Sequence, residues 1–322
     1  MPQILKNNHL EIKIDLPTEN YRFSRFDWTG KIVSVKFKDL LITGSENNEG
    51  DPDNVLGKGL YNEFGIETPL GFAETPIGGW FHKIGVGLLK KEDARYKFDK
   101  KYEIRPAAFK ITQAHNRLLI RSTSETMNGY SYVLEKNIEL YENSFTITYT
   151  LDNTGNKKII TDEYVHNFMA IDKTPIGNNY SLQFPFQLQP TQFIETVNPE
   201  KKVLLEQHKI TFKDTINETF FFSNLTGIEN ATAQWTLKNL KNQLTVRETG
   251  SFATNKVNLW GTKHVISPEL FFNIDLAPDS SVSWSRKFEV FQTKIVRARC
   301  TSLLLFLFLF SKKLIFLRNI IA

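Results

Sequence analysis

Short runs in which apolar and polar residues alternate recur along most of the chain, with turn-forming residues between them. Side chains on a β-strand point alternately to the two faces of a sheet, so a period of two predicts strands. The expected strands are 31–43, 130–141, 144–152, 181–188, 203–212, 218–225, 232–237, 243–248, 271–276 and 281–291, and Glu142-Asn143 joins the second and third in a hairpin. No segment of ordinary helix length shows a helical period. The pattern therefore predicts an all-β chain.

The order of these elements predicts how they are assembled. At least ten strands without intervening helices are typical of an antiparallel sandwich or barrel rather than a parallel sheet. No linker rich in Pro, Gly or Ser divides the series, and no repeat of fixed period is visible. We expect one large antiparallel β-domain over about residues 5–291, followed by a tail at 292–322 that differs in character.

Residues 47–91 interrupt the strand pattern. Residues 47–58 are rich in Gly, Asp and Asn and predict a loop. Residues 59–91 mix Gly and Pro with aromatic residues, which predicts a long, ordered loop set on a sheet. Loops longer than about 15 residues in a compact domain are usually functional. The alternative is a lid that only covers the core.

His166 is the strongest catalytic candidate among the six histidines. Within residues 162–171, alternation places it on the same strand face as Tyr164 and Phe168, and the opposite face is also largely apolar. A histidine between two aromatic residues is either a satisfied core residue or a proton donor in an aromatic-lined pocket. Such a pocket suits a sugar, whose C–H face packs on rings while its hydroxyls need polar partners.

Glu269 lies at the start of a second informative stretch. Leu270, Phe272, Ile274 and Leu276 form one apolar face, so Glu269 projects to the other side. It follows Pro268, which cannot donate a hydrogen bond to a ladder. A carboxylate at a strand end is usually solvated, but Trp260 and His264 just upstream favour a functional role.

The charge distribution argues against a nucleic-acid partner. The formal net charge is +5 and the isoelectric point is about 9.0, which on its own would favour polyanion binding. Residues 292–322 hold six of the cations and no acid, so residues 1–291 carry a formal charge of −1. The basic character belongs to the tail, and we expect no nucleic-acid binding.

The tail and the cysteine content bear on location. The single cysteine, Cys300, lies in the tail, which favours a reducing compartment, and no secretory signal is visible at the N-terminus. We expect a cytoplasmic protein. The uninterrupted apolar run at 303–310 has eight residues, against about 20 for a spanning helix. The tail is therefore expected to be at most an interfacial anchor, and a non-native extension is the alternative.

Common cofactor and metal motifs are absent from the sequence. It has no His-x-x-x-His or paired-Cys spacing, no phosphate-binding Gly-Lys-Ser/Thr loop, no dinucleotide fingerprint and no Gly-x-Ser-x-Gly elbow. We expect neither a metal nor a cofactor.

Several stretches, taken in order, resemble the aldose 1-epimerase (galactose mutarotase-like) family. They are Arg22-Phe23-Ser24-Arg25-Phe26-Asp27-Trp28-Thr29-Gly30, Glu63-Phe64-Gly65-Ile66 with Pro69-Leu70-Gly71-Phe72, 83–89, Tyr164-Val165-His166-Asn167-Phe168, Ser267-Pro268-Glu269-Leu270-Phe271, 276–278 and 283–286. The resemblance implies a large antiparallel β-sandwich of the supersandwich type, with a sugar pocket on one concave sheet. It also implies an isomerase of carbohydrate metabolism.

The resemblance also implies roles for individual residues. Glu269 would take the proton from the anomeric hydroxyl and His166 would protonate the ring oxygen. The ring then opens, the C1–C2 bond rotates, and reclosure gives the other anomer without a cofactor. Acid and base must act on opposite sides of one small site, so a structure that places them a hexose width apart on the walls of one pocket would favour the enzyme. His82, Lys83 and Arg25 are expected to contact the small-molecule sugar.

The motifs depart from the typical family pattern, which leaves a second function open. A typical galactose mutarotase has an Asn-His-Thr-Tyr-Phe segment where this chain reads Tyr-Val-His-Asn-Phe, and residues 78–82 are only the nearest match to a His-Gly-Gly motif. Because a fold does not fix a function, a non-catalytic carbohydrate-binding protein on the same fold is the alternative. The sequence does not name the sugar.

Overall fold

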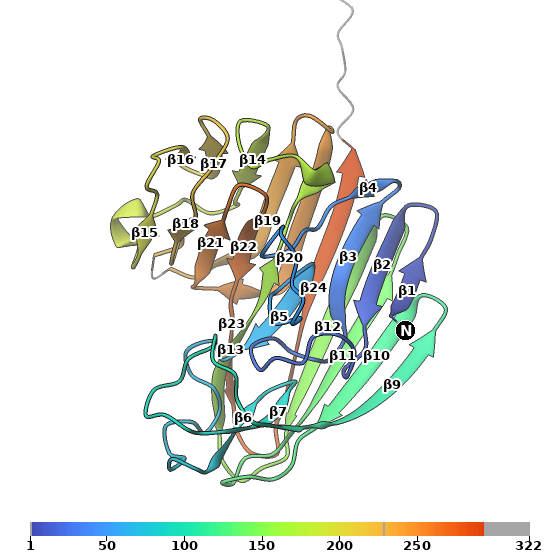
Figure 1. The fold of residues 1–322 in the computed structure, drawn as a ribbon, viewed down its shortest axis with the longest axis vertical. Coiled ribbons are helices and arrows are strands. Elements are labelled where there is room, and N and C mark those ends of the chain that lie inside the picture. The colour runs from blue at the N-terminus through green and yellow to red at the C-terminus, as the bar shows by residue number, and fades with distance from the viewer. Residues whose placement is uncertain (1, 228, 293–322) are drawn as a thin grey trace, which may run out of the picture. The chain divides into compact units, whose positions relative to one another are not determined.

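A computed structural model describes residues 2–227 and 229–292 (Figure 1). The expectations for Cys300 and for an interfacial anchor or non-native extension fall on residues outside the described part. Among the described residues, no helix has the length and apolar character needed to cross a bilayer.

The prediction of an all-β chain is confirmed. Over the described ranges the only helices are two short 3-10 turns, η1 (Ile171–Lys173) and η2 (Pro190–Gln192). The expected hairpin is also present: β11 (Tyr132–Leu140) pairs with β12 (Ser144–Asn153) in antiparallel register across Glu142-Asn143.

Two large antiparallel sheets form the body. The ten-stranded sheet has the order β16 (Val203–Leu205), β17 (Lys209–Phe212), β14 (Tyr180–Gln183), β19 (Ala231–Asn239), β20 (Leu244–Thr254), β24 (Ser281–Gln292), β12, β11, β10 (Arg117–Thr123) and β9 (Ala108–Ala114). The seven-stranded sheet has the order β1 (Gln3–Lys6), β2 (Leu10–Asp15), β3 (Lys31–Phe37), β5 (Leu60–Phe64), β13 (Ile159–Asn167) and β23 (Phe272–Leu276), with β4 (Leu40–Leu41) on β3.

Two smaller sheets complete the described part. One has the order β15 (Thr196–Val197), β18 (Phe220–Phe222), β21 (Val257–Gly261) and β22 (Ile266–Leu270). The other has the order β6 (Trp80–Lys83), β7 (Gly87–Lys90) and β8 (Ile104–Pro106). Both contribute residues to the candidate site described below.

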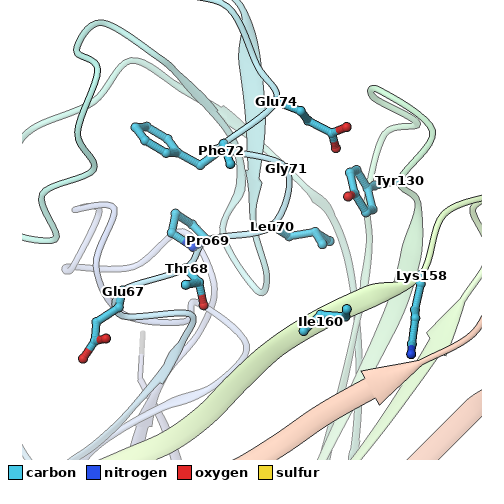
Figure 2. Close-up of a pocket in the computed structure, with 11 residues that line it drawn as sticks. Glu67, Thr68, Pro69, Leu70, Gly71, Phe72, Glu74, Tyr130, Lys158 and Ile160 are labelled. Carbon is cyan, nitrogen blue, oxygen red and sulfur yellow. The ribbon is translucent and has the colours of Figure 1, made fainter.

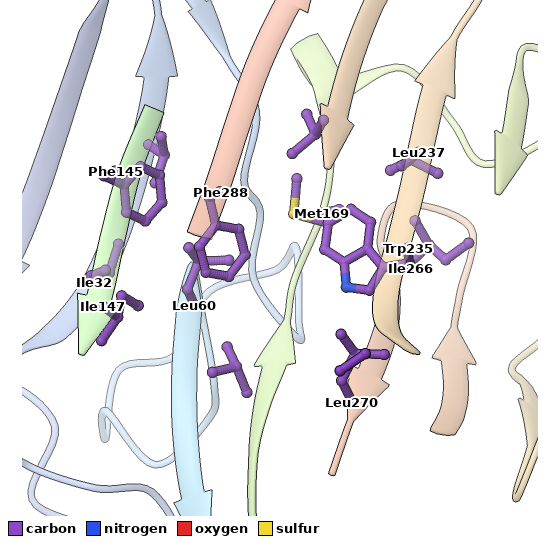
Figure 3. Packing of buried hydrophobic residues seen from close by; sticks show 14 of the residues in the cluster. Ile32, Leu60, Phe145, Ile147, Met169, Trp235, Leu237, Ile266, Leu270 and Phe288 are labelled. Atoms are coloured by element: carbon purple, nitrogen blue, oxygen red, sulfur yellow. The ribbon is translucent and has the colours of Figure 1, made fainter. Parts of the chain in front are cut away.

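The main core lies between the two large sheets. Ile32 and Leu60 of the seven-stranded sheet pack with Phe145, Ile147 and Phe288 of the ten-stranded sheet (Figure 3). All five are almost fully buried, and each such side chain contributes roughly 1.5–3 kcal/mol. Two sheets packed through one apolar layer are a β-sandwich, which confirms the predicted architecture.

A second aromatic cluster covers the other face of the seven-stranded sheet. On β5, Leu60 belongs to the main core whereas Tyr61 belongs to this second cluster, as the alternation of side chains on a strand requires. Phe26, Phe81 and Phe168 are also members. The central strands of this sheet are therefore buried on both faces, and the candidate site lies on the face away from the ten-stranded sheet.

The prediction of one strand over 31–43 is wrong. β3 ends at Phe37, Lys38 adopts a left-handed conformation with φ 53°, and β4 returns along β3. The register of β2 with β3 also shifts, so Ile32 and Val35 are both in the main core although strict alternation puts them on opposite faces. The shift is a β-bulge, which sequence alternation alone does not reveal.

The prediction that 59–91 is a long loop is also wrong. The segment contains β5, β6 and β7, and all five residues of β5 are buried between β3 and β13. A strand buried on both faces has no alternation of polar and apolar residues, so the sequence of β5 lacks the pattern that predicts a strand. The predicted strand 203–212 is likewise two strands, β16 and β17, that form a hairpin.

Candidate active site

His166 lies near the end of β13, the strand between β5 and β23 in the seven-stranded sheet. Tyr164, His166 and Phe168 share one face, as predicted, and the rings of His166 and Phe168 stack with centroids 4.0 Å apart and an interplanar angle of 3°. Across the strand pair, His166 is opposite Tyr61 and Tyr164 is opposite Glu63. Neighbouring strands thus place an aromatic residue beside the histidine and a carboxylate beside Tyr164.

Glu269 belongs to a different sheet and is buried. The predicted strand 271–276 corresponds to β23, whereas Glu269 lies on the separate strand β22, opposite Asn258 on β21. Its side chain is only 6% exposed, so Glu269 is not the solvated carboxylate that is usual at a strand end. The hydroxyl of Ser267 donates a hydrogen bond of 3.2 Å to Oε1 of Glu269.

The fold brings His166 and Glu269 into direct contact. Nε2 of His166 is 3.4 Å from Oε1 of Glu269, and both side chains are 6% exposed. The two groups therefore lie at one site, but closer together than the width of a hexose. A sugar oxygen held by hydrogen bonds to both groups needs about 5–6 Å between them, so the two side chains would have to separate around a substrate.

Aromatic rings enclose the pair. The edge of Trp260 faces the His166 ring with centroids 5.3 Å apart, and Phe26 lies at 6.3 Å in the same edge-on geometry. Phe271, next in the chain to Leu270, stacks on Tyr164 at 4.6 Å. The aromatic lining expected for a sugar-handling pocket is thus present around His166 and Tyr164.

Burial shifts the titration of both groups in opposite directions. Desolvation raises the pKa of Glu269 to about 8, while Arg25 and the Ser267 hydroxyl oppose that rise. Desolvation, and secondarily Arg25, lowers the pKa of His166 well below its ordinary value. At neutral pH the contact therefore consists of a protonated carboxyl and a neutral imidazole that together hold one transferable proton.

Arg25 and Lys83 converge on a third acid, Glu63. Lys83 Nζ is 3.0 Å from Oε1 of Glu63, and Arg25 Nε is 3.1 Å from Oε2. The Tyr164 hydroxyl donates a 2.7 Å hydrogen bond to the same carboxylate. Glu63 is completely buried, so these three partners replace the water that an ionised carboxylate needs.

Arg25 pairs with Glu63 and also acts electrostatically on both His166 and Glu269. Its guanidinium lies between the rings of Phe26 and Phe98, 4.5 Å from each centroid, and NH1 is 3.7 Å from Glu46. Its side chain is 12% exposed. Arg25 and Lys83 both lie at the site, where the family resemblance expects them. The Lys83 side chain is only 1% exposed, however, and its ammonium group is paired with Glu63.

Glu63 is a residue of the site whose role the sequence pattern does not reveal. It lies in one of the stretches that resemble the family, and two buried cations next to each other require an anion. This requirement identifies Glu63 only when the structure shows that Arg25 and Lys83 are buried in the same place.

The structure does not bring His82 to this site. Its ring lies beside Tyr130 and Tyr132, and Nε2 is 3.4 Å from the carbonyl oxygen of Met127. Adjacent residues of a strand point to opposite faces, so His82 and Lys83 diverge. Burial lowers the pKa of His82 to about 4, which leaves the ring neutral.

The described surface also has cavities that lie apart from the acid–base pair. One of about 310 Å³ lies between the 67–74 loop and the start of β13, lined by Leu70, Tyr130, Lys158 and Ile160 (Figure 2). None of its lining residues belongs to the cluster around Glu63. Within residues 2–227 and 229–292, no group of three His, Cys, Asp or Glu side chains has the geometry of a metal site.

Comparison with known proteins gives similarity at the level of the fold. No family model and no curated protein matches the sequence. A solved structure from Synechocystis sp. PCC 6803 superposes with a TM-score of 0.59 at 13% identity, covering 91% of this chain and 96% of that one. A putative aldose 1-epimerase from Escherichia coli K12 gives 0.58 at 9% identity, with coverage of 91% and 99%.

A third solved structure, a galactose mutarotase-like protein from Lactobacillus casei, gives a TM-score of 0.54 at 12% identity, with coverage of 90% and 100%. These matches span nearly the whole described unit and nearly the whole of each matched chain. Together with the antiparallel sheets described above, they show that this chain has the galactose mutarotase-like fold.

Proposed function

We propose that this protein is an aldose 1-epimerase-like carbohydrate enzyme that interconverts sugar anomers by acid–base ring opening. The observation that carries the proposal is the contact of His166 with Glu269, buried among aromatic rings and holding one proton. The resemblance of the motifs and the likeness to putative aldose 1-epimerases support the same reaction class.

The reaction needs one proton donor and one proton acceptor at the anomeric centre. In the proposed step Glu269, as carboxylate, accepts the proton of the O1 hydroxyl while His166, as imidazolium, donates a proton to the ring oxygen. The C1–O5 bond breaks and an open-chain aldehyde forms. Rotation about C1–C2 and the reverse proton transfers then give the other anomer, and both side chains return to their starting states.

Productive binding requires a redistribution of the proton in the unliganded pair. Burial keeps the proton on Glu269 and His166 neutral, so the proton must cross the 3.4 Å contact before or during sugar binding. The hydroxyls of a bound sugar would solvate the resulting carboxylate and imidazolium. The total proton count of the pair stays at one throughout.

The direct test is the relaxation of freshly dissolved α-glucose and α-galactose to anomeric equilibrium, followed by polarimetry. We expect the wild-type protein to accelerate the relaxation and Glu269→Gln to lose most of that acceleration, because an amide cannot accept the O1 proton. Removing one proton-transfer group costs about 10²–10⁴-fold. Equal relaxation rates with and without wild-type protein would overturn the proposal for these sugars.

A second candidate is a non-catalytic carbohydrate-binding protein. The departures of Tyr164-Val165-His166-Asn167-Phe168 and of residues 78–82 from the typical family motifs leave this function open, because a fold does not fix a function. This reading expects saturable sugar binding in calorimetry without faster anomer exchange. Wild-type binding together with acceleration that Glu269→Gln abolishes would exclude it.

A further inference from the structure

The sheet that carries His166 opens next to Glu269. β13 is paired with β23 as far as Glu163 and Phe272, and a single bridge between Met169 and Ile266 joins it to β22 farther along. In the described part of the chain, no backbone ladder joins 164–168 to 267–271. The two segments that hold the acid–base pair are therefore neighbours without the usual main-chain hydrogen bonds.

Two buried side chains bridge this opening. Asn167 Nδ2 donates a 2.7 Å hydrogen bond to the carbonyl oxygen of Pro268, and Arg286 NH2 donates one of 2.8 Å to that of Leu270. Those carbonyls flank Glu269 on both sides. Arg286 NH2 also lies 3.5 Å from the carbonyl oxygen of Glu163, so the guanidinium contacts the backbone of both segments.

A buried ion network fixes the two bridging side chains. Arg286 pairs with Glu163 and with Glu248, each at 2.7 Å, and all three side chains are completely buried. Asn167 Nδ2 donates to the same Glu248 carboxylate at 2.9 Å. A planar guanidinium held by two carboxylates has one orientation, so its remaining N–H groups point in a fixed direction.

The network lies on the core side of the sheet, opposite to the acid–base pair. The indole N–H groups of Trp284 and Trp235 donate to Glu163 at 2.9 Å and to Glu248 at 2.6 Å. In the described part of the chain, the rings and polar groups that contact His166 and Glu269 do not include any side chain of this network. Its influence on the pair must therefore pass through the backbone.

We infer that Arg286 and Asn167 are positioning residues that replace the missing ladder and fix the backbone of the Glu269 segment relative to that of His166, so that only the two side chains move apart around a sugar. The inference rests on the proposed function for its catalytic consequence, but the geometry it describes is independent of turnover. A buried ion pair is weak evidence for stability on its own, whereas a fixed orientation is a well-attested use of one. A misplacement of about 1 Å in an acid–base pair costs about 100-fold in rate.

The test compares Asn167→Leu and Arg286→Lys in the full chain. The leucine fills the space without donating to Pro268, and the lysine keeps the charge but not the forked donors. Lys136→Met is the matched control, because it removes a buried ion pair of 3.2 Å with Asp27 and, among the described residues, Lys136 has no side-chain hydrogen bond or ion pair with β13 or β22. Unfolding by denaturant confirms that each variant is folded and reports its loss of stability.

The decisive readout is the titration of the Glu269 carboxyl, followed by carbon NMR of glutamate-labelled protein and assigned with Glu269→Gln. Release of the segment should let water reach the carboxyl, so its pKa should fall from about 8 toward its ordinary value in both variants and stay unchanged in the control. A titration unchanged in both variants, or shifted equally in the control, would overturn the inference.

The rate measurement separates this inference from the proposed function. With active wild type, both variants should lose about 100-fold in kcat with little change in KM, and the control should lose neither. Loss confined to KM would overturn the positioning role. If wild type accelerates no anomer exchange, the proposed function fails, yet the Glu269 titration still decides whether Arg286 and Asn167 fix the carboxyl.

Discussion

At the scale of single residues, burial decides where the proton of the pair resides. A carboxylate and an imidazolium are both costly in an apolar site, so desolvation favours the neutral form of each. Arg25 is near enough to oppose the effect on Glu269 and to reinforce it on His166. The pair therefore keeps one proton from near neutral pH up to the pKa of Glu269.

This proton count predicts the pH profile of the proposed reaction. The active form holds one proton, and ionisation of Glu269 at a pKa of about 8 leaves the pair without it. We expect kcat/KM, corrected for spontaneous mutarotation, to be level near neutral pH and to fall as the pH rises through about 8. Protonation of His166 sets the acidic limit, well below its ordinary pKa. A rate that rises through pH 8 would contradict the shared-proton assignment.

Glu63 predicts a second effect at the residue scale. Glu63→Gln should lower the free energy of unfolding by about 3–5 kcal/mol, because Lys83 and Arg25 then keep buried charges without their shared anion. Chemical denaturation measures the change. Lys83→Met in the Glu63→Gln background should recover part of the loss, since it removes one uncompensated charge. A loss below about 1 kcal/mol in the single variant would show that water or Glu46 already neutralises the cluster.

At the scale of elements, the position of strand β5 depends on how closely its backbone approaches that of β3 at Gly59, the residue just before β5. Gly59 has φ +63°, and a Cβ there would lie 2.1 Å from the carbonyl oxygen of Ile32 on β3. The residue is therefore glycine for two reasons, conformation and space. β5 carries Tyr61 and Glu63, so this approach also sets the position of the site.

Gly59→Ala and Gly78→Ala form a matched pair that separates the two reasons. Gly78 has φ +88° with nothing within 4 Å of its added Cβ. Gly78→Ala should cost about 1 kcal/mol from backbone strain alone, and Gly59→Ala several times more because β3 and β5 must move apart. Thermal unfolding measures both. Equal losses of stability in the two variants would mean that β3 and β5 can move apart without a loss of free energy, and that Gly59 does not set the position of β5.

Strands could be predicted from the sequence where one alternation runs without interruption. The hairpin of β11 and β12 and the face shared by Tyr164, His166 and Phe168 are examples. The prediction failed where pairing partners override alternation: at the bulge beside Ile32, in the doubly buried β5, and at Phe271, where one apolar run divides between two sheets. Alternation describes one strand and contains no information about its neighbours.

At the scale of the whole described unit, both faces of one sheet are used for different purposes. The face toward the ten-stranded sheet holds the apolar core and the Arg286 network, and the other face holds the aromatic cluster, Glu63 and the acid–base pair. A sheet covered on both sides keeps its strands rigid, which suits a site whose groups come from several strands.

Part of the candidate site can be predicted from the sequence, and the rest depends on which strands become neighbours. Sequence phase identified His166, and motif resemblance pointed to Glu269, Arg25 and Lys83, which the fold does bring together. Glu63 was missed and His82 lies elsewhere, because both depend on which strands become neighbours. Neither the 3.4 Å contact nor the opening in the ladder beside Glu269 could be read from spacing.

The measurement that tests the central claim most directly is a double-mutant cycle on anomer exchange, using Glu269→Gln, His166→Phe and the double variant. If the two groups act as one acid–base unit, each single variant should lose about as much rate as the double, because either substitution already disables the proton relay. Magnetisation-transfer NMR between the α and β anomers at equilibrium gives all four rates. Losses that simply add, or a wild-type rate equal to that of the buffer, would contradict the account.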